Sequence, residues 1–341
     1  MLAPEKVSDF PLVTIAIPIR NEARLLLGLL EAVRAQTWPL QAMQVIVMDG
    51  LSEDESVAIA NAAADDFFDF EVISNPGRIA ATALNLALER ARGTYFLRLD
   101  ARSRPAPDYI EQCVISLQSG PWAGVAGAQV VVGDSPQSWP IALAISCSLG
   151  TGWPAYRRVD TSCESETLFL GAYPTAKLRQ IGGWDERFVA NEDYELNTRL
   201  RKNRGKLMVA RTVQITYIAR DTLKGLACQY HKYGSWRVRT WLKHPHSIQP
   251  RHLAPAVWAA GLVVGVLLLP ITYWPLLLFA VPYVLSVTLM AAKLASRYNW
   301  RSFTRIWLSF PFMHLCWGFG FWRSLLLLPF RGQAWRQDCD K

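Results

Sequence analysis

A chain of 341 residues with 51% hydrophobic residues and a mean hydropathy of +0.11 is too apolar for one ordinary globular domain and too polar for an all-helical transporter. The net charge of +8 is unevenly divided, because residues 1–223 hold 22 Lys and Arg against 26 Asp and Glu, whereas residues 224–341 hold 14 against 2. Positive charge gathered around an apolar run indicates a lipid surface as partner and argues against nucleic acid. The composition predicts a soluble domain joined to a membrane segment.

Neither the N-terminus nor the cysteines indicate export of the soluble domain. The first ten residues lack a basic region followed by an apolar stretch, so no cleaved signal peptide is expected. The six cysteines include no Cys-x-x-Cys pair, which favours reduced thiols over a disulfide framework or a zinc site. We therefore expect the soluble domain in the cytoplasm.

Strand-like and helix-like segments alternate over the first hundred residues. Ser52 followed by Glu55 predicts a capping box that opens one helix. The remaining segments are amphipathic helices at 22–35 and 79–92 and short β-rich runs at 13–17, 45–48, 70–73 and 94–99. This β-α-β-α-β-α-β pattern predicts a doubly wound α/β sheet, in which ligands bind at the carboxyl ends of the strands. Pro18, Asp49, Asn75 and Asp100 all fall at those ends.

A run of forty residues, 253–292, carries no Asp, Glu, Lys, Arg or His. Because about 20 apolar residues cross the hydrocarbon core as a helix, this run is long enough for two passes. Pro270-Ile-Thr-Tyr-Trp-Pro275 supplies a turn near its middle. Both flanks are expected on the cytoplasmic side, because each is rich in basic residues: Lys224, Lys232, Arg237, Arg239, Lys243 and Arg251 before the run, and Lys293, Arg297, Arg301 and Arg305 after it.

A further apolar segment, 306–330, contains Pro311, His314 and Arg323. An arginine near the middle of a span costs about 2.5–3.5 kcal/mol on insertion scales, but Arg323 lies close enough to the end of the segment to reach the interface. We expect a third membrane helix here and retain an interfacial or re-entrant helix as the alternative. The expected domains are 1–220 for the soluble domain, 221–252 for a basic juxtamembrane segment, 253–293 for a membrane hairpin, 294–330 for a basic loop and third helix, and 331–341 for a tail.

Six short motifs occur in an order and spacing that resemble membrane-associated glycosyltransferases of family 2, with the GT-A nucleotide-sugar fold. The similarity covers about Val13 to Tyr233 and is closest to the succinoglycan-type glucosyltransferases of bacterial exopolysaccharide assembly. The motifs are Ile17-Pro-Ile-Arg-Asn-Glu22, Met48-Asp-Gly-Leu-Ser-Glu-Asp54, Asn75-Pro-Gly-Arg-Ile-Ala-Ala-Thr-Ala-Leu-Asn85, Leu99-Asp-Ala-Arg102, Gly182-Gly-Trp-Asp-Glu186 and Asn191-Glu-Asp-Tyr-Glu-Leu196.

The resemblance assigns the nucleotide-sugar side of the site. Asp49 would accept the imide N–H of a uracil ring, while Pro18, Arg20 and Glu22 would shape the pocket for base and ribose. Arg78 would meet the diphosphate beside a helix N-terminus. Each residue also has a plain structural interpretation: Asp49 as a turn residue, Glu22 as an acid that favours its helix dipole, and Arg78 as a surface arginine.

Asp100 would bind the divalent cation, magnesium or manganese, that bridges the diphosphate of the donor. The family's usual Asp-x-Asp is altered here, because Arg102 replaces the second acid. Magnesium tolerates one protein carboxylate, since it keeps several waters. The cation would then have Asp100 as its one protein carboxylate, together with phosphate oxygens and waters. Arg102 is an alternative source of part of the charge neutralisation.

The resemblance places the catalytic base at Asp193, which would remove a proton from the acceptor hydroxyl during a direct, inverting attack. Glu192 lies beside it on the acceptor side, as do Gly171 and Trp184. First-turn acids that suit a helix dipole and ordinary turn glycines are the plain alternatives. Segment 229–237 lacks the Gln-x-x-Arg-Trp motif of processive relatives, which favours transfer of a single sugar.

The function implied is transfer of a hexose from a UDP-sugar to a lipid-linked saccharide at the cytoplasmic face of the inner membrane. The expected partners are membrane lipid and polysaccharide-assembly proteins. Nucleic acid is not expected as a partner. Two alternatives stay open: a transferase that uses polyprenyl phosphate as acceptor, and a non-catalytic nucleotide-sugar-binding subunit of a synthase complex.

Overall fold

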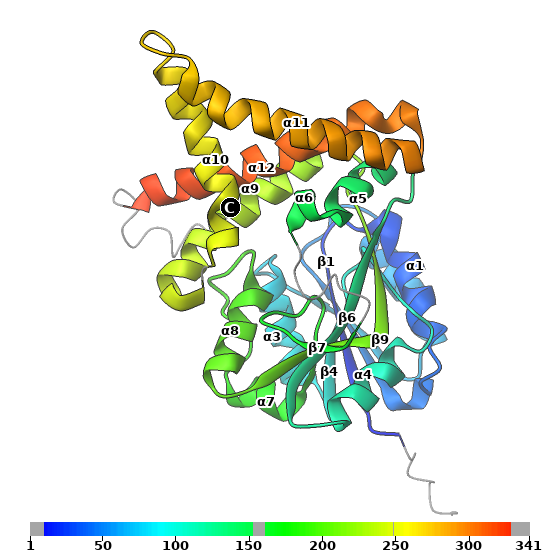
Figure 1. Cartoon of the computed structure of the whole chain (residues 1–341). Coiled ribbons are helices and arrows are strands. Elements are labelled where there is room, and N and C mark those ends of the chain that lie inside the picture. Colours follow the sequence, from blue (N-terminus) through cyan, green and yellow to red (C-terminus); the bar gives the residue numbers. More distant parts are fainter. Residues whose placement is uncertain (1–9, 153–160, 248, 329–341) are drawn as a thin grey trace, which may run out of the picture. The chain divides into compact units, whose positions relative to one another are not determined.

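The computed structural model describes residues 10–152, 161–247 and 249–328 (Figure 1). The chain folds as two compact units: a sheet unit, Met1–Gln129 with Ala155–Tyr217, and a helical unit, Val130–Pro154 with Ile218–Lys341. The later boundary lies close to the expected one at residue 220. Segment 130–154, which the sequence analysis left in the soluble domain, groups with the C-terminal helices. The expected tail, 331–341, and the end of the apolar segment 306–330 lie outside the described residues.

The sheet unit is built on a mixed sheet with the strand order β3-β2-β1-β4-β8-β6-β9-β5, and β7 pairs with β9. This confirms the predicted mixed α/β architecture. The strands are β1 Val13–Ile19, β2 Met43–Asp49, β3 Phe70–Ser74, β4 Tyr95–Arg98, β5 Ser103–Pro105, β6 Trp122–Val132, β7 Cys163–Glu164, β8 Ala172–Pro174 and β9 Lys206–Ile218.

The four N-terminal strands run parallel, and their register determines where the polar residues meet. Ile19 of β1 lies opposite Asp49 of β2, which in turn lies opposite Ser74 of β3. On the other side of β1, Ala16 lies opposite Arg98 of β4. The carboxyl ends of these strands therefore form one edge of the sheet, where the sequence places its polar residues.

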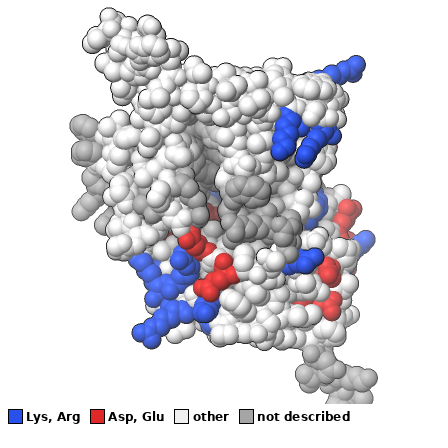
Figure 2. All heavy atoms as spheres, viewed as in Figure 1, with Lys and Arg blue, Asp and Glu red and all other residues white. Residues whose placement is uncertain are grey.

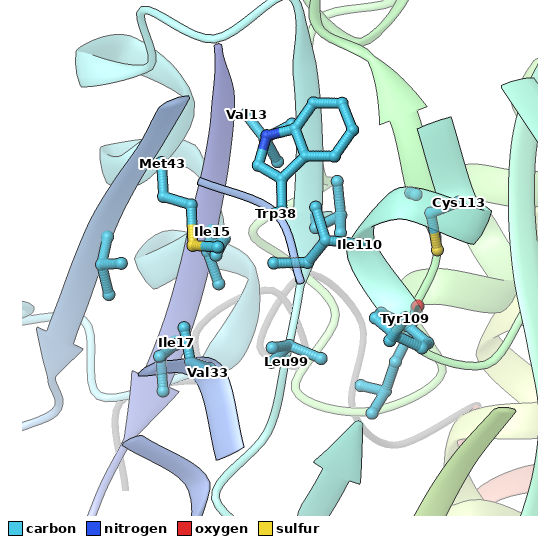
Figure 3. Packing of buried hydrophobic residues seen from close by; sticks show 14 of the residues in the cluster. Val13, Ile15, Ile17, Val33, Trp38, Met43, Leu99, Tyr109, Ile110 and Cys113 are labelled. Carbon is cyan, nitrogen blue, oxygen red and sulfur yellow. Dashed lines mark hydrogen bonds between the residues drawn. The ribbon is translucent and has the colours of Figure 1, made fainter. Parts of the chain in front are cut away.

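Both faces of the sheet are covered by helices, as the near-continuous apolar strands predict. Successive residues of a strand point to opposite faces, so Ile15 and Ile17 of β1 enter one buried cluster while Ala16 enters the other. Figure 3 shows the first cluster, which contains Val33 and Ile110 together with residues of β1. The helices of this unit are α1 Ala23–Arg34, α2 Ser56–Ala62, α3 Ala80–Arg90, α4 Tyr109–Gln118, α7 Thr175–Gln180 and α8 Glu192–Lys202.

The predicted capping box at Ser52 is wrong. Helix α2 begins at Ser56, and no side chain caps its N-terminus. The Ser52 hydroxyl instead accepts a hydrogen bond from the backbone N–H of Asn21, 2.9 Å away. A tertiary contact between two loops has taken the serine that local sequence assigned to a helix start.

The helical unit contains α5 Ser138–Ser146, α6 Ser148–Thr151, α9 Leu223–Lys243, α10 Pro250–Leu267, α11 Trp274–Arg297 and α12 Phe303–Leu326. Helices α9 and α12 cross in backbone contact at two glycines. A Cβ at Gly234 would lie 2.0 Å from the carbonyl oxygen of Trp317, and one at Gly320 would lie 2.2 Å from that of His231. Only glycine permits this approach, so the crossing depends on both positions.

Among the described residues, α11 is the one helix long and apolar enough to cross a membrane. Only 11% of the most apolar 18-residue stretch of α11 is buried, which distinguishes this helix from a core helix of a soluble protein. The apolar part of α10, His252–Leu267, is shorter than the ~20 residues that a span needs. Helix α12, which carries Arg305, His314 and Arg323, is not among the described helices that are long and apolar enough to span. The expectation of several membrane-spanning helices is thus supported for one.

The α10 and α11 hairpin nonetheless presents a large apolar surface. Figure 2 shows no charged side chain on the part of the hairpin near its turn. Its exposed hydrophobic residues include Val263, Val264, Val266, Leu267, Leu269, Ile271, Leu277, Leu278, Val281, Leu285 and Leu289. An exposed apolar surface of this extent marks an interaction site, and lipid is the partner that its composition fits.

Candidate active site

The loops that follow β1 and β2 are tied together at the sheet edge. The N–H of Glu22 donates to the Ser56 hydroxyl at 2.8 Å, and the N–H of Ala23 donates to Asp54 Oδ2 at 3.1 Å. The N–H of Glu53 donates to Asn21 Oδ1 at 2.8 Å. These contacts hold the segment that carries Pro18, Arg20 and Glu22 against the segment that follows Asp49.

Asp49 lies at the end of β2 and is 7% exposed. The backbone N–H of Ser52 reaches both carboxylate oxygens at 3.2 Å, so the side chain closes its own turn. A carboxylate has about four acceptor sites and can accept further donors. The turn interpretation is therefore correct, and it leaves acceptor capacity for the imide N–H that the resemblance implies.

Side-chain hydrogen bonds hold the turn before α3. Asn75 is 2% exposed, and its side chain donates to the carbonyl of Ile79 at 3.0 Å and accepts from the Thr82 hydroxyl at 2.8 Å. Asn75 therefore shapes the turn itself. Arg78 has a φ of 57° and is exposed, and its side chain forms no ion pair within the described part of the chain. It is available to an anion beside the N-terminus of α3, which begins at Ala80 without a side-chain cap.

At the end of β4, the guanidinium of Arg98 joins three carboxylates. Its Nε lies 2.9 Å from Asp100 Oδ1, and its second terminal nitrogen lies 3.3 Å from Asp100 Oδ2. The other terminal nitrogen lies 2.8 Å from Glu192 Oε1 and 2.9 Å from Asp193 Oδ1. The Arg98 side chain is 8% exposed, against 12%, 20% and 31% for Glu192, Asp193 and Asp100. The predicted metal ligand, Asp100, and the predicted base, Asp193, thus contact the same buried guanidinium.

The carboxyl group of Asp193 has a raised pKa. Burial raises its pKa from 3.8 to about 6, and the negative charges of Glu192 and Asp100 act in the same direction. The charge of Arg98 and a hydrogen bond from Trp184 Nε1, 3.1 Å from Oδ1, oppose this rise in the pKa. A base with a pKa near the working pH combines adequate basicity with a large deprotonated fraction. Both contacts are to Oδ1, so among the described residues Oδ2 accepts no hydrogen bond.

Trp184 is held from several sides. Its backbone N–H donates to Asn85 Oδ1 at 2.8 Å, and its carbonyl accepts from Asn85 Nδ2 at 2.9 Å. The indole packs at 5.6 Å from the ring of Phe96 and edge-on at 6.4 Å from that of Tyr173. The preceding Gly183 has a φ of 64°, which favours glycine at this turn. These contacts fix the direction of the indole N–H toward Asp193.

Gly171, which the resemblance places on the acceptor side, is buried and directly precedes β8. Its carbonyl accepts the backbone N–H of Arg98 at 3.2 Å, and a Cβ there would lie 2.4 Å from the Tyr173 hydroxyl. The hydroxyl of Tyr173 donates to Asn197 Oδ1 at 3.1 Å. Gly171 therefore leaves room for the side chain of Tyr173, and its place on the acceptor side stays a prediction.

The structure brings Asp100, Trp184, Glu192 and Asp193 into one cluster. Pro18, Arg20, Glu22 and Asp49 lie at the ends of the neighbouring strands. The side chains of Arg102 and Glu22, 3.8 Å apart, link the two groups.

Arg98 is not among the site residues predicted from the sequence. A signal was present, because a charged residue inside an apolar strand is tolerated only when it is paired. The run Tyr-Phe-Leu-Arg-Leu before Asp100 thus predicts acidic partners for Arg98.

The donor set at Asp100 fits a divalent cation only together with a substrate. No cluster of three or more His, Cys, Asp or Glu within residues 10–152, 161–247 and 249–328 is arranged to hold a metal ion. Asp100 is the one partly exposed acid at the end of β4, and Arg102 occupies the place of a second. Magnesium commonly binds through one or two carboxylates, substrate phosphates and waters, so the residues present fit such a cation.

The fold and this edge of the sheet define the class of the protein. A solved structure with the same architecture is a mannosyltransferase from Pyrobaculum calidifontis in complex with GDP-mannose and Mn²⁺. Its TM-score is 0.59 at 19% identity, and the match covers 93% of this chain and 88% of that one. The fold is that of GT-A glycosyltransferases.

Sequence comparison names the family. The model of glycosyl transferase family 2 matches residues 14–179. The chain is 30% identical over 321 residues to the succinoglycan biosynthesis protein ExoA of Rhizobium meliloti. This match covers 92% of this chain and 94% of the relative. It is 23% identical over 231 residues to a Methanococcus voltae glucuronosyltransferase named for a dolichyl N-acetylglucosaminyl phosphate substrate, over 65% of this chain and 72% of the relative. The protein belongs to glycosyltransferase family 2.

Proposed function

We propose that this glycosyltransferase moves a hexose from a UDP-sugar to a lipid-linked saccharide, with inversion, in bacterial exopolysaccharide or cell-surface glycan synthesis. The observation that carries the proposal is the state of Asp193. Its pKa of about 6 and its open Oδ2 suit removal of a proton from an acceptor hydroxyl as that oxygen attacks the anomeric carbon. Direct displacement needs one base and no carboxylate nucleophile.

Asp49, Arg78 and Asp100 divide the recognition of the donor. Asp49 would accept the N–H of the uracil ring, and Arg78 would contact the diphosphate beside the N-terminus of α3. Asp100 would hold magnesium or manganese, which supplies charge neutralisation for the departing nucleotide. Pro18, Arg20 and Glu22 would surround the base and ribose, because they lie in or just after the end of β1, which pairs with the strand that carries Asp49.

The acceptor assignment is supported by relatives and by the helical unit. ExoA is named for succinoglycan biosynthesis, and the Methanococcus voltae relative is named for a dolichyl-linked substrate. The apolar helix α11 and the exposed apolar surface of the hairpin fit attachment to lipid, where such acceptors reside. We place the protein at the cytoplasmic face of the inner membrane, where UDP-sugars are available.

One observation favours a second candidate, a non-catalytic nucleotide-sugar-binding subunit of a synthase complex. It is the incomplete Asp-x-Asp motif, in which Arg102 replaces an acid. The intact surroundings of Asp193 weigh against this candidate.

A polyprenyl monophosphate acceptor would use the same site with phosphate as nucleophile, and a phosphate oxygen needs no proton removed at neutral pH. An enzyme of that kind would therefore be insensitive to Asp193→Asn.

The test is UDP release by the purified full-length protein in lipid nanodiscs, with a panel of UDP-sugars and a lipid extract as acceptor source. We expect release with one UDP-sugar, dependent on the extract and abolished by Asp193→Asn. Asp49→Ala should weaken UDP binding in calorimetry, and unchanged affinity would show that the base pocket has been misplaced. Binding without release from any sugar would favour the non-catalytic candidate.

A further inference from the structure

Arg98 differs from Arg104 and Arg179, two other arginines of the sheet unit, in what its guanidinium touches. Arg104 donates to the carbonyls of Leu25 and Ala101, and Arg179 donates to those of Leu88 and Ala91. Within the described residues the guanidinium of Arg98 contacts no backbone group, only the carboxylates of Asp100, Glu192 and Asp193. Its side chain therefore organises acids and not the course of the chain.

The contacts are divided according to the two sides of the reaction. Nε and one terminal nitrogen form a fork on both oxygens of Asp100, at the end of β4. The remaining terminal nitrogen reaches Glu192 and Asp193, at the start of α8. Because a guanidinium is planar and rigid, orienting one carboxylate with the fork also sets where the third nitrogen lies. A lysine ammonium is a point charge and cannot make both sets of contacts in this geometry.

We propose that Arg98 is a positioning residue of the transfer reaction, holding Asp100 for the donor and Asp193 for the acceptor with a single guanidinium. It occupies Oδ1 of Asp193 and leaves Oδ2 toward the acceptor hydroxyl. It also keeps Asp100 in one orientation, which compensates for the missing second acid of the motif. The inference rests on the proposed function, because it assigns Asp100 and Asp193 to donor and acceptor.

The plain alternative is that Arg98 only offsets buried negative charge. Removing the single cation among three carboxylates leaves like charges facing one another, which destabilises a protein whatever the role of the cation. Loss of stability in a neutral variant therefore does not discriminate. Arg98→Lys does, because it keeps the charge and removes the fork.

The experiment compares wild type, Arg98→Lys and the control Arg179→Lys, all as full-length protein in nanodiscs. Turnover is expressed per UDP-binding site counted by calorimetry, so unfolded protein does not contribute. Manganese binding in the presence of UDP is followed by electron paramagnetic resonance, which needs no catalysis. We expect Arg98→Lys to lose about 10- to 100-fold in turnover per site, with little change in the KM of the UDP-sugar at saturating manganese. The manganese titration should shift to higher concentration, and Arg179→Lys should match wild type in both readouts.

Wild-type turnover per site and an unchanged manganese titration in Arg98→Lys would overturn the inference while leaving the proposed function intact. Absence of transfer by the wild-type protein would overturn the proposed function and the inference with it. Should Arg98→Lys fail to fold, the double variant Arg98→Gln/Glu192→Gln removes one charge of each sign and is read in the same way. Normal turnover per site in that variant would likewise overturn the role of Arg98.

Discussion

The indole N–H of Trp184 donates to Asp193 Oδ1 across 3.1 Å, the same oxygen that Arg98 contacts. Two donors on one oxygen leave the other oxygen of the base open and stabilise its charged form. The pKa of Asp193 is therefore a balance between burial, which raises it, and these two donors, which lower it. Several measurable consequences depend on that balance.

Trp184→Phe should shift the pH dependence of the enzyme. The phenyl ring keeps most of the packing against Phe96 and Tyr173 but removes the donor, so the pKa of Asp193 should rise above its value of about 6. Because the base works deprotonated, the acidic limb of a kcat against pH profile should lie near pH 6 in wild type and move to higher pH in the variant. Turnover should fall more at pH 6.5 than at pH 8. An equal loss at both pH values would assign Trp184 a packing role alone.

Asp193→Asn should leave UDP affinity near wild type while cutting turnover at least about a hundredfold, because only proton removal is lost. Calorimetry and UDP release measure the two effects separately. Turnover near that of wild type would remove Asp193 from the base role.

The same variant should be more stable than wild type at pH 7.5. The pKa of Asp193 is raised in the folded protein, so its favourable contribution to folding is full below the unfolded pKa of 3.8 and is lost as the pH rises through about 6. Removing the ionised group should recover up to about 3 kcal/mol at neutral pH. The difference in Tm between variant and wild type should shrink as the pH is lowered from 7.5 to 5. A constant difference would contradict the raised pKa.

Activity should require magnesium or manganese and should depend on Asp100. Excess chelator is expected to abolish UDP release, and added manganese to restore it. Asp100→Asn, which keeps a weaker oxygen ligand, should need more cation for half-maximal activity. Full activity in chelator would transfer charge neutralisation to Arg78 and Arg102.

The positions of the basic residues predict the topology of the hairpin. Positive charge resists translocation on both sides of the apolar run, so the turn between α10 and α11 should face the far side of the membrane. In a background without the six native cysteines, a cysteine at Thr272 should be labelled by an impermeant reagent in intact cells, and one at Ser302 should not. Because α10 is short for a span, the same experiment tests whether the hairpin crosses the membrane. Protection of the cysteine at position 272 would mean that the hairpin enters the membrane without crossing it.

The N-terminal half of the sheet could be read from the sequence because its strands are buried on both faces, which makes them continuous apolar runs. The expected strand at 45–48 is the core of Met43–Asp49, and the helix expected at 79–92 is observed at Ala80–Arg90. The spacing of the apolar residues and the length of the apolar segment are enough to predict such elements. The short strand β8 between β4 and β6 leaves no comparable pattern.

The candidate site was predictable as a set of strand ends but not as a network of contacts. Resemblance located Asp100 and Asp193, 93 positions apart in the chain, yet the residue that joins them carries no motif. Ser52 shows the opposite error, in which a strong local signal yielded to a contact with Asn21. Both cases turn on long-range contacts, which a single sequence does not display.

The crossing of α9 and α12 constrains how such enzymes can be recombined. Because the two helices meet closely at Gly234 and Gly320, where a Cβ would lie 2.0 and 2.2 Å from a carbonyl oxygen of the other helix, a clash at either position cannot be relieved by changing rotamers. A chimera that exchanges α12 between relatives while keeping the native α9 would place a Cβ into a carbonyl wherever the glycine is lost. An exchange of the C-terminal region between relatives therefore has to transfer both helices together, although about 60 residues separate the end of α9 at Lys243 from the start of α12 at Phe303.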